Sequence, residues 1–411
     1  MNTKKNVFLW VLYDFANSLV MIVFFLYFAQ WLVIDRAVPD IYYNLTFTVT
    51  ALLLLFTVPL TGTLLDKYVR RITGIRYTTV LTSIFYGICA LFAIYNHEIY
   101  ALIFFTLGSY MYLLSFTFYT PLINDISRPE KRGLVSGLGT SANYLGQIAG
   151  LLMVLPLSNG SLSFFEGAPR AETLLPSVVA FLVLSLPMLI FFNEPKKESG
   201  KLIFKDGIKE MISETKILFS MAGVGFFLLS YFLFNDAILT SVNNLPIYLE
   251  QVWGVTDTIK TYLLLAVLVA STVGGVLSGL IADKFGHKRT LTCILFVWVL
   301  LFPALGLVRN FSVFVGLCIL LGLFYGSNWT VSRSVMSYVA PPGKHNLAFA
   351  YYGLAERASS FLGPIVWGGI VTGFLAMGST RYRIAMFSLS IFVLLALLFL
   401  LKVKDDRKKE F

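Results

Sequence analysis

Long runs of apolar residues alternate with short polar connections along the whole chain. About 20 apolar residues are enough for a helix to cross a bilayer, and the pattern contains twelve such runs. They cover residues 8–34, 43–65, 77–96, 99–121, 134–157, 173–193, 218–249, 258–282, 290–308, 311–336, 347–375 and 381–403. The pattern therefore predicts an all-α membrane protein with twelve transmembrane helices.

The longest polar interruption, at residues 193–216, separates six of these runs from the other six. We expect an N-terminal six-helix bundle over 1–193, a cytoplasmic linker over 194–217 and a C-terminal six-helix bundle over 218–411. The linker contains a short amphipathic pattern at 204–212, which is typical of a helix lying on the membrane surface. Tethering of the two halves is the expected role of this segment, and regulation is the alternative.

Composition and charge fit a membrane protein. The chain is 57% hydrophobic and 13% charged, with a mean hydropathy of +0.78, far more apolar than a soluble domain. The net charge of +10 would suit nucleic acid, but 24 of the 32 lysine and arginine residues fall in alternate connections on one side of the membrane. The other side has six, namely Arg36, Arg170, Lys260, Arg309, Arg381 and Arg383. This asymmetry predicts cytoplasmic termini and gives no reason to expect a nucleic-acid partner.

The two halves repeat each other. Gly62, Asp66 and Lys67 in GTLLDKY recur 217 residues later in GLIADKF, and the same shift takes Leu145-Gly146 to Leu362-Gly363. A shift of 222 residues takes Asp14 to Asp236. Repeats of this kind are common in secondary transporters, and they predict two pseudo-symmetric bundles.

The segment GLIADKFGHKRT at 279–290 resembles the loop signature of the major facilitator superfamily. Five further motifs resemble its autophagy-related vacuole effluxer-like branch, namely LYDFANS, SGLGTSANYLG, FLFNDAILT, SRS and FAYYGLAERASSFLGP. That branch holds uncharacterised bacterial members and a fungal vacuolar protein linked to amino-acid export. The resemblance implies the twelve-helix major facilitator fold, rocking of two bundles around a central cavity, and a monomer in a bacterial plasma membrane. Glu356-Arg357 stands where the branch has Gly-Lys, which weakens the inference of a substrate.

The repeated loops are the candidate gates. Gly62 and Gly279 would let neighbouring helices approach closely, while Asp66 and Asp283 can cap a facing helix or accept hydrogen bonds from an arginine such as Arg289. Pro246 removes a backbone donor from the seventh span and predicts a bend suited to an outer gate. Plain topology signals and ordinary helix irregularity are the alternatives.

Three carboxylates lie inside apolar spans, where such groups are costly unless they have a partner or a function. Asp236 lies about 18 residues into its span and therefore near mid-membrane, whereas Asp14 lies about 6 residues into its own. We expect Asp236 to be the main coupling site for a proton or sodium ion, with Asp14 and Glu356 as further candidates. A static interhelical hydrogen bond remains open for Asp236, and packing with Asn17 remains open for Asp14.

Two arginines within the spans are candidates for binding an anionic group. Arg357 lies well inside the eleventh span, whereas Arg333 is close enough to a span end to extend to the headgroups. Asn143 and Gln147 are four residues apart and share one helical face. The remaining candidate cavity-lining residues are Asn17, Asn235, Tyr13, Tyr144, Tyr231, Asn328, Trp329 and Tyr351, each of which also suits ordinary packing.

The three histidines, His97, His287 and His345, fall in predicted loops, and the chain has no phosphate-binding loop or hydrolase motif. We expect no enzyme activity, no metal site and no cofactor apart from the coupling proton or sodium ion. The predicted function is secondary active transport of a small polar or zwitterionic, amino-acid-like solute, with the proton as the expected driving ion. The alternatives are a sodium- or proton-coupled sugar or glycoside symporter and, from another class, a lipid-moving protein or membrane receptor.

Overall fold

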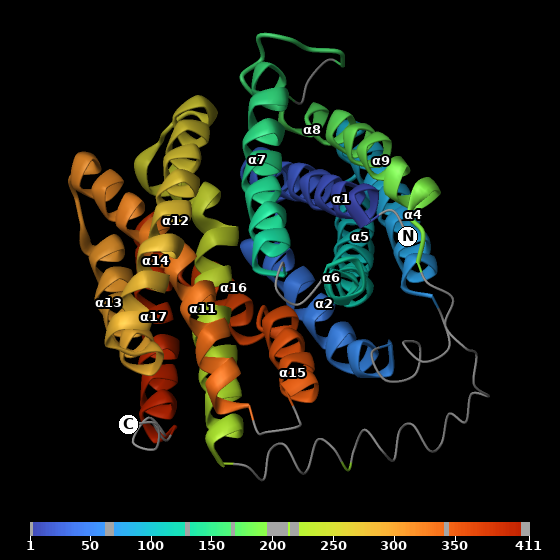
Figure 1. Cartoon of the computed structure of the whole chain (residues 1–411). Coiled ribbons are helices and arrows are strands. Elements are labelled where there is room, and N and C mark those ends of the chain that lie inside the picture. The colour runs from blue at the N-terminus through green and yellow to red at the C-terminus, as the bar shows by residue number, and fades with distance from the viewer. Residues whose placement is uncertain are drawn as a thin grey trace. The chain divides into compact units, whose positions relative to one another are not determined.

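The computed structural model describes residues 3–61, 70–127, 132–165, 169–194, 213, 222–340 and 345–403. Every regular element in these ranges is a helix, and eleven helices there are long and apolar enough to cross a membrane (Figure 1). The predicted all-α membrane architecture is therefore confirmed. The gate predictions at Gly62 and Asp66, and the amphipathic segment 204–212, lie outside the described residues.

The chain divides into two compact units. Unit 1 comprises Met1–Pro39 and Leu52–Ile208, and unit 2 comprises Asp40–Ala51 and Lys209–Phe411. Helix α2 (Asp40–Leu60) therefore contributes its first part, Asp40–Ala51, to unit 2. We call this part the α2 segment.

Unit 1 is built around its first span, in which α1 (Thr3–Val23) continues through two π-helical stretches, η1 (Phe24–Phe28) and η2 (Trp31–Asp35). Helix α1 packs mainly against α7 and α9, and α4 packs against α5. The other elements are α4 (Arg71–Ile94), α5 (Glu98–Tyr119), η4 (Thr120–Leu122), α6 (Ile123–Ile126), α7 (Arg132–Ser158), α8 (Pro169–Glu172) and α9 (Leu174–Phe191).

Glycines on α7 allow it to lie against the backbone of α1. A methyl group added at Gly146 would come within 2.3 Å of the Phe15 carbonyl oxygen, and one added at Gly150 would come within 2.6 Å of the Leu19 carbonyl oxygen. Small residues permit such contact between membrane helices, where association depends on packing. The α1–α7 pair is therefore closely packed, and α1 holds Asp14 at this interface.

Unit 2 contains the α2 segment and the C-terminal helices. Helix α11 packs mainly against α17, and α12 packs against α14. The elements are α11 (Ala222–Trp253), α12 (Asp257–Phe285), α13 (His287–Leu307), α14 (Phe311–Val339), α15 (His345–Ala358), α16 (Leu362–Gly373), η6 (Leu375–Met377) and α17 (Thr380–Lys402). Helix α11 continues through Pro246 without interruption.

Helices α12 and α14 approach each other closely at two glycines. An added methyl group would lie 1.9 Å from the Leu323 carbonyl oxygen at Gly274, and 1.8 Å from the Ser271 carbonyl oxygen at Gly326. At Gly279, where we predicted the close approach, a methyl group would make an ordinary contact of 3.6 Å with Thr330. The predicted close approach at Gly279 is therefore not found, and α12 meets the backbone of α14 at Gly274 instead.

The predicted eleventh span, 347–375, is not one helix. It is divided into α15 and α16 at residues 359–361 (Figure 1). Pro364 is the third residue of α16, a position where its missing N–H would have no partner within the helix. In an uninterrupted helix the same proline would remove a hydrogen bond and clash with the preceding turn. A helix that begins at Leu362 therefore accommodates Pro364. Hydropathy alone did not predict the break, because the apolar run continues through it.

Candidate functional site

The carboxylate of Asp236 lies at the break between α15 and α16. Its Oδ1 accepts a hydrogen bond from the backbone N–H of Phe361 (3.1 Å), and its Oδ2 accepts from Leu362 (2.9 Å) and Gly363 (2.8 Å). The side chain is fully buried. Asp236 thus caps the first turn of α16, where unpaired N–H groups and the helix dipole favour a negative charge.

The preceding residue, Asn235, binds the other side of the break. Its Nδ2 donates to Ser359 Oγ (2.5 Å) and to the Glu356 carbonyl oxygen (3.3 Å), and Ser359 Oγ also donates to that carbonyl (2.8 Å). Adjacent residues of α11 therefore hold the end of α15 and the start of α16.

Unit 2 brings together the charged residues predicted for solute binding. Glu356 is a charged neighbour of both Arg333 and Arg357. Arg357 is near the end of α15, next to the break, and not deep within a continuous span as predicted. A methyl group added at Gly353 would lie 3.5 Å from a guanidinium nitrogen of Arg357, so the arginine side chain lies close to the preceding turn of its own helix. Arg333 has an exposed side chain on α14.

The aromatic and amide candidates of unit 2 lie on α11, α14 and α15, and Tyr231 and Tyr352 are near Glu356 and Arg333. The rings of Tyr231 and Tyr352 stack with centroids 4.2 Å apart, and the Tyr352 hydroxyl is 3.0 Å from Ser332 Oγ. The amide of Asn328 is buried, and neither of its polar atoms has a hydrogen-bond partner among the described residues. The indole of Trp329 meets the ring of Tyr325 edge to face at 4.3 Å. Tyr231, Asn328, Arg333 and Glu356 thus belong to one unit.

Asp14 in unit 1 has different surroundings from its repeat counterpart. The side chains of Asn143 and Tyr119 lie beside its carboxylate, and the Tyr119 hydroxyl donates to the Trp10 carbonyl oxygen (3.0 Å). A methyl group on Gly139 of α7 would lie 3.4 Å from Asp14 Oδ2. Asp14 therefore faces an unbroken helix, whereas Asp236 faces the start of one.

The predicted shared face of Asn143 and Gln147 is confirmed, since Gln147 Nε2 donates to Asn143 Oδ1 at 2.7 Å. Asn17 Nδ2 donates to the Tyr13 carbonyl oxygen of its own helix (2.9 Å), and the Tyr13 hydroxyl lies 2.6 Å from Thr79 Oγ1. Tyr144 lies half-buried on α7. Tyr13 and Asn17 thus make contacts suited to helix packing.

The contacts made by the α2 segment were not indicated by any sequence pattern. Asn44 and Asn244 donate to each other's side-chain oxygens at 3.0 and 2.9 Å, and both side chains are fully buried. The hydroxyl of Thr48 donates to the carbonyl oxygen of Phe361, at the helix break (3.0 Å). The Tyr382 hydroxyl on α17 donates to Asp40 Oδ2 (3.1 Å).

The second copy of the repeated loop forms the turn from α12 to α13. Gly286 has a φ of 106°, which L side chains rarely adopt, and it joins the two helices. The side chain of Asp283 is 75% exposed, with Oδ1 3.6 Å from His287 Nε2, and Arg289 is exposed in the first turn of α13. His287, expected in a loop, is the first residue of α13, and its ring lies 4.8 Å from that of Tyr338.

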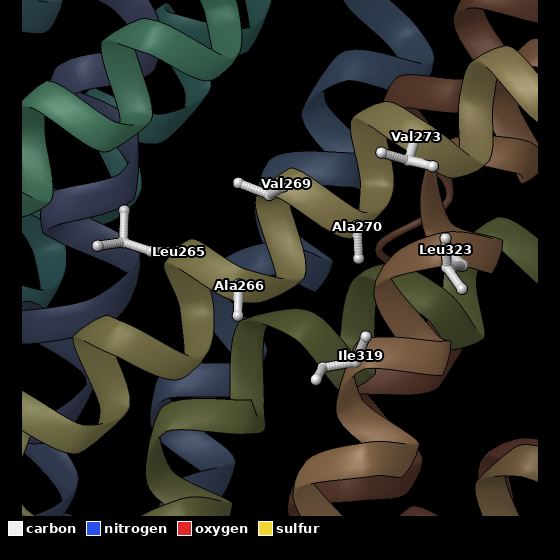
Figure 2. Close-up of a pocket in the computed structure, with 7 residues that line it drawn as sticks. All are labelled: Leu265, Ala266, Val269, Ala270, Val273, Ile319 and Leu323. Atoms are coloured by element: carbon white, nitrogen blue, oxygen red, sulfur yellow. The ribbon is translucent and has the colours of Figure 1, made fainter.

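A pocket of about 500 Å³ lies between α12 and α14 (Figure 2). Its lining consists of Leu265, Ala266, Val269, Ala270, Val273, Ile319 and Leu323. These side chains have no group that can donate or accept a hydrogen bond. The pocket is therefore unsuited to recognising a polar solute.

The family model of vacuole effluxers like Atg22 matches residues 123–410. A multidrug resistance efflux pump PmrA homologue of Lactococcus lactis is 23% identical over 407 residues, covering 96% of this chain and 93% of the relative. Autophagy-related protein 22 of Saccharomyces cerevisiae is 27% identical over 196 residues, covering 44% of this chain and 36% of the relative.

Solved transporters share the fold. The nucleoside transporter NupG aligns with a TM-score of 0.74 and 12% identity, covering 99% of this chain and all of that one. A bacterial homologue of the human lysosomal transporter Spinster aligns with a TM-score of 0.71 and 14% identity, covering 98% and 96%. A D-xylose–proton symporter aligns at 0.69 and 15% identity, covering 99% and 98%.

The repeated halves and the membrane helices are features of a major facilitator transporter. The matches to known proteins agree with this. The chain belongs to the vacuole effluxer Atg22-like family within that superfamily.

Proposed function

We propose that this transporter moves a small zwitterionic solute of the amino-acid type and uses the proton as its driving ion. The observation that carries the proposal is the position of Glu356 as a charged neighbour of both Arg333 and Arg357 in unit 2. A zwitterion needs one partner of each sign, and this set has both. Charge-assisted hydrogen bonds to such groups are about twice as strong as neutral ones.

An unpaired amide on α14, the helix that carries Arg333, supports a hydrophilic solute. Asn328 is 1% exposed, with an amide that makes no hydrogen bond to another described residue. Leaving a buried amide unpaired costs about 1–3 kcal/mol. A solute with a hydroxyl, amine or carboxylate would satisfy it. We therefore place solute recognition around Asn328, Arg333, Glu356 and Arg357.

The contacts of Asp236 favour the proton over sodium as the ion acting there. Hard metal cations in proteins take oxygen ligands. The three hydrogen-bonding contacts of the Asp236 carboxylate are backbone N–H donors, which direct positive charge toward it. Addition of a proton, in contrast, needs no set of oxygen ligands. Asp14 and Glu356 remain secondary candidates for the coupling site.

Transport of a sugar or nucleoside is the second candidate, because two of the fold relatives are described as a D-xylose–proton symporter and a nucleoside transporter. These solutes carry no carboxylate, so they would not use the positive charge of the two arginines. The predicted positive-inside charge pattern further leads us to propose cytoplasmic termini in a plasma membrane.

A binding screen followed by uptake tests the proposal. Purified protein would be heated with amino acids, sugars and nucleosides in turn, since a ligand of the folded state raises the apparent melting temperature. Positive compounds would then be followed into proteoliposomes as radiolabelled solutes. We expect an amino acid to raise the apparent melting temperature and to show counterflow exchange in the proteoliposomes. Both effects with sugars alone would favour the second candidate and refute the first.

A further inference from the structure

Residue Phe361 makes two hydrogen bonds in opposite directions. Its N–H donates to Asp236 Oδ1 at 3.1 Å, and its carbonyl oxygen accepts from the Thr48 hydroxyl at 3.0 Å. Phe361 lies in the break between α15 and α16, where the backbone is free of regular helical bonding. One residue therefore connects a carboxylate on α11 to a hydroxyl on the α2 segment.

The α2 segment is held in unit 2 by other polar contacts on the same helices. The Asn44–Asn244 amide pair joins it to α11, where the Tyr43 hydroxyl also donates to the Asn243 carbonyl oxygen (3.4 Å). An added methyl group on Gly368 of α16 would be 2.8 Å from Ile41 Cα, so α16 lies directly against the segment. A change at the start of α16 would therefore reach the α2 segment through both Thr48 and this packing.

We propose that Asp236 controls how firmly the α2 segment is held, with Phe361 as the connection, so that protonation of Asp236 releases the segment. The ionised carboxylate accepts three N–H groups at the N-terminus of α16. Protonation removes its charge, and hydrogen bonds to a neutral group are about half as strong. The hydrogen bonds at the start of α16 then break more often, and Phe361 moves relative to Thr48. The α2 segment therefore separates more often from the helices of unit 2 that it contacts. This inference rests on the proposed function only in taking the proton as the coupling ion.

Other charged groups on elements packed against α11 must be distinguished from Asp236. They are Asp40 on the α2 segment, Arg333 on α14, His345, Glu356 and Arg357 on α15, and Arg381, Arg383 and Lys402 on α17. The arginines and the lysine keep their charge across the pH range of carboxyl titration. Glu356, Asp40 and His345 are therefore the controls, since the two carboxylates and the imidazole can change charge on acidification and each lies on one of these elements.

Two threonines provide a matched pair for the connection itself. Thr48 and Thr46 are both buried in the α2 segment, at 5% and 4% exposure. The Thr46 hydroxyl donates to the Tyr43 carbonyl oxygen of its own helix (2.6 Å), whereas the Thr48 hydroxyl donates across to Phe361. Thr48→Val removes the hydrogen bond to Phe361. Thr46→Val also removes a buried threonine hydroxyl, but leaves that hydrogen bond in place.

Hydrogen–deuterium exchange of the purified full-length protein tests the proposal without any transport step. Exchange in residues 40–51 and 361–363 would be compared at pH ~8 and pH ~5, a range in which carboxyl groups buried away from water titrate, after correction for intrinsic rates. We expect acid to increase exchange in both segments of the wild type and of Thr46→Val. In Thr48→Val, residues 361–363 should still respond, while 40–51 should exchange about two- to tenfold faster at both pH values, the factor expected for one lost hydrogen bond.

Variants of the carboxylates complete the test. Asp236→Asn should exchange rapidly in both segments at either pH, whereas Glu356→Gln, Asp40→Asn and His345→Gln should retain the response to acid. An unaltered acid response of residues 40–51 in Thr48→Val would overturn the connection through Phe361. Loss of the response in Glu356→Gln with its retention in Asp236→Asn would overturn the role of Asp236. Failure of solute uptake would refute the proposed function and leave these exchange results standing.

Discussion

Asn44 and Asn244 form a closed pair in which each side-chain amide donates to the oxygen of the other. The second N–H of each amide is also used, since Asn44 donates to the Asp40 carbonyl oxygen (3.0 Å) and Asn244 to that of Thr240 (2.9 Å). All the donors of this buried pair are therefore satisfied. Such networks specify one arrangement strongly, because a partial loss leaves a buried polar group unpaired.

Breaking this pair should give strongly non-additive losses of stability. Asn44→Ala and Asn244→Ala should each lower the free energy of unfolding by about 1–3 kcal/mol, because the remaining amide is left buried without its partner. The double variant should lose much less than the combined loss of the two single variants. Thermal unfolding of the four proteins in detergent measures this coupling, and additive losses would show that the pair contributes no mutual stabilisation.

The glycine contact between α1 and α7 gives a second prediction. Gly146→Ala places a methyl group 2.3 Å from the Phe15 carbonyl oxygen, so the helices must separate, at a cost of about 1–3 kcal/mol. Gly137→Ala on the same helix meets nothing within 4 Å, and alanine is the better helix former. We expect a lower melting temperature for the first variant and an equal or higher one for the second. Equal melting temperatures would contradict the close packing.

The arginines should act only on solutes that carry a carboxylate. Arg357→Gln or Arg333→Gln should weaken binding of an amino acid by about 10- to 100-fold, the range for loss of a charged hydrogen bond. The corresponding amine without the carboxylate should bind equally to wild type and variant. Arg309→Gln is the control, since Arg309 is exposed in the connection between α13 and α14. Equal weakening for both solutes would mean that the arginines act on the fold and not on the carboxylate.

The membrane helices and the duplication could be predicted from the sequence. Hydropathy locates spans because each must be apolar over the thickness of the bilayer. The repeat placed Asp14 and Asp236 at matching positions on α1 and α11, and helical spacing placed Asn143 and Gln147 on one face. These properties depend on residues near one another in the chain or on direct similarity between the halves.

The helix break and the α2 segment required the structure. Residues 362–374, which follow the break, are apolar apart from Thr372, so hydropathy shows one run, and Pro364 was the available signal. The Asn44–Asn244 pair joins positions 200 residues apart that the repeat does not relate. The different surroundings of Asp14 and Asp236 also arise here, because only Asp236 faces the start of a helix.

The measurement that tests the central claim most directly is solute uptake into proteoliposomes driven by an imposed pH gradient, with wild-type protein and Asp236→Asn. The gradient should stimulate uptake by the wild type. The variant lacks the carboxyl that caps α16, so it should retain counterflow exchange of the solute and show no stimulation by the gradient. Full stimulation of uptake in Asp236→Asn would contradict the assignment of Asp236 as the coupling residue.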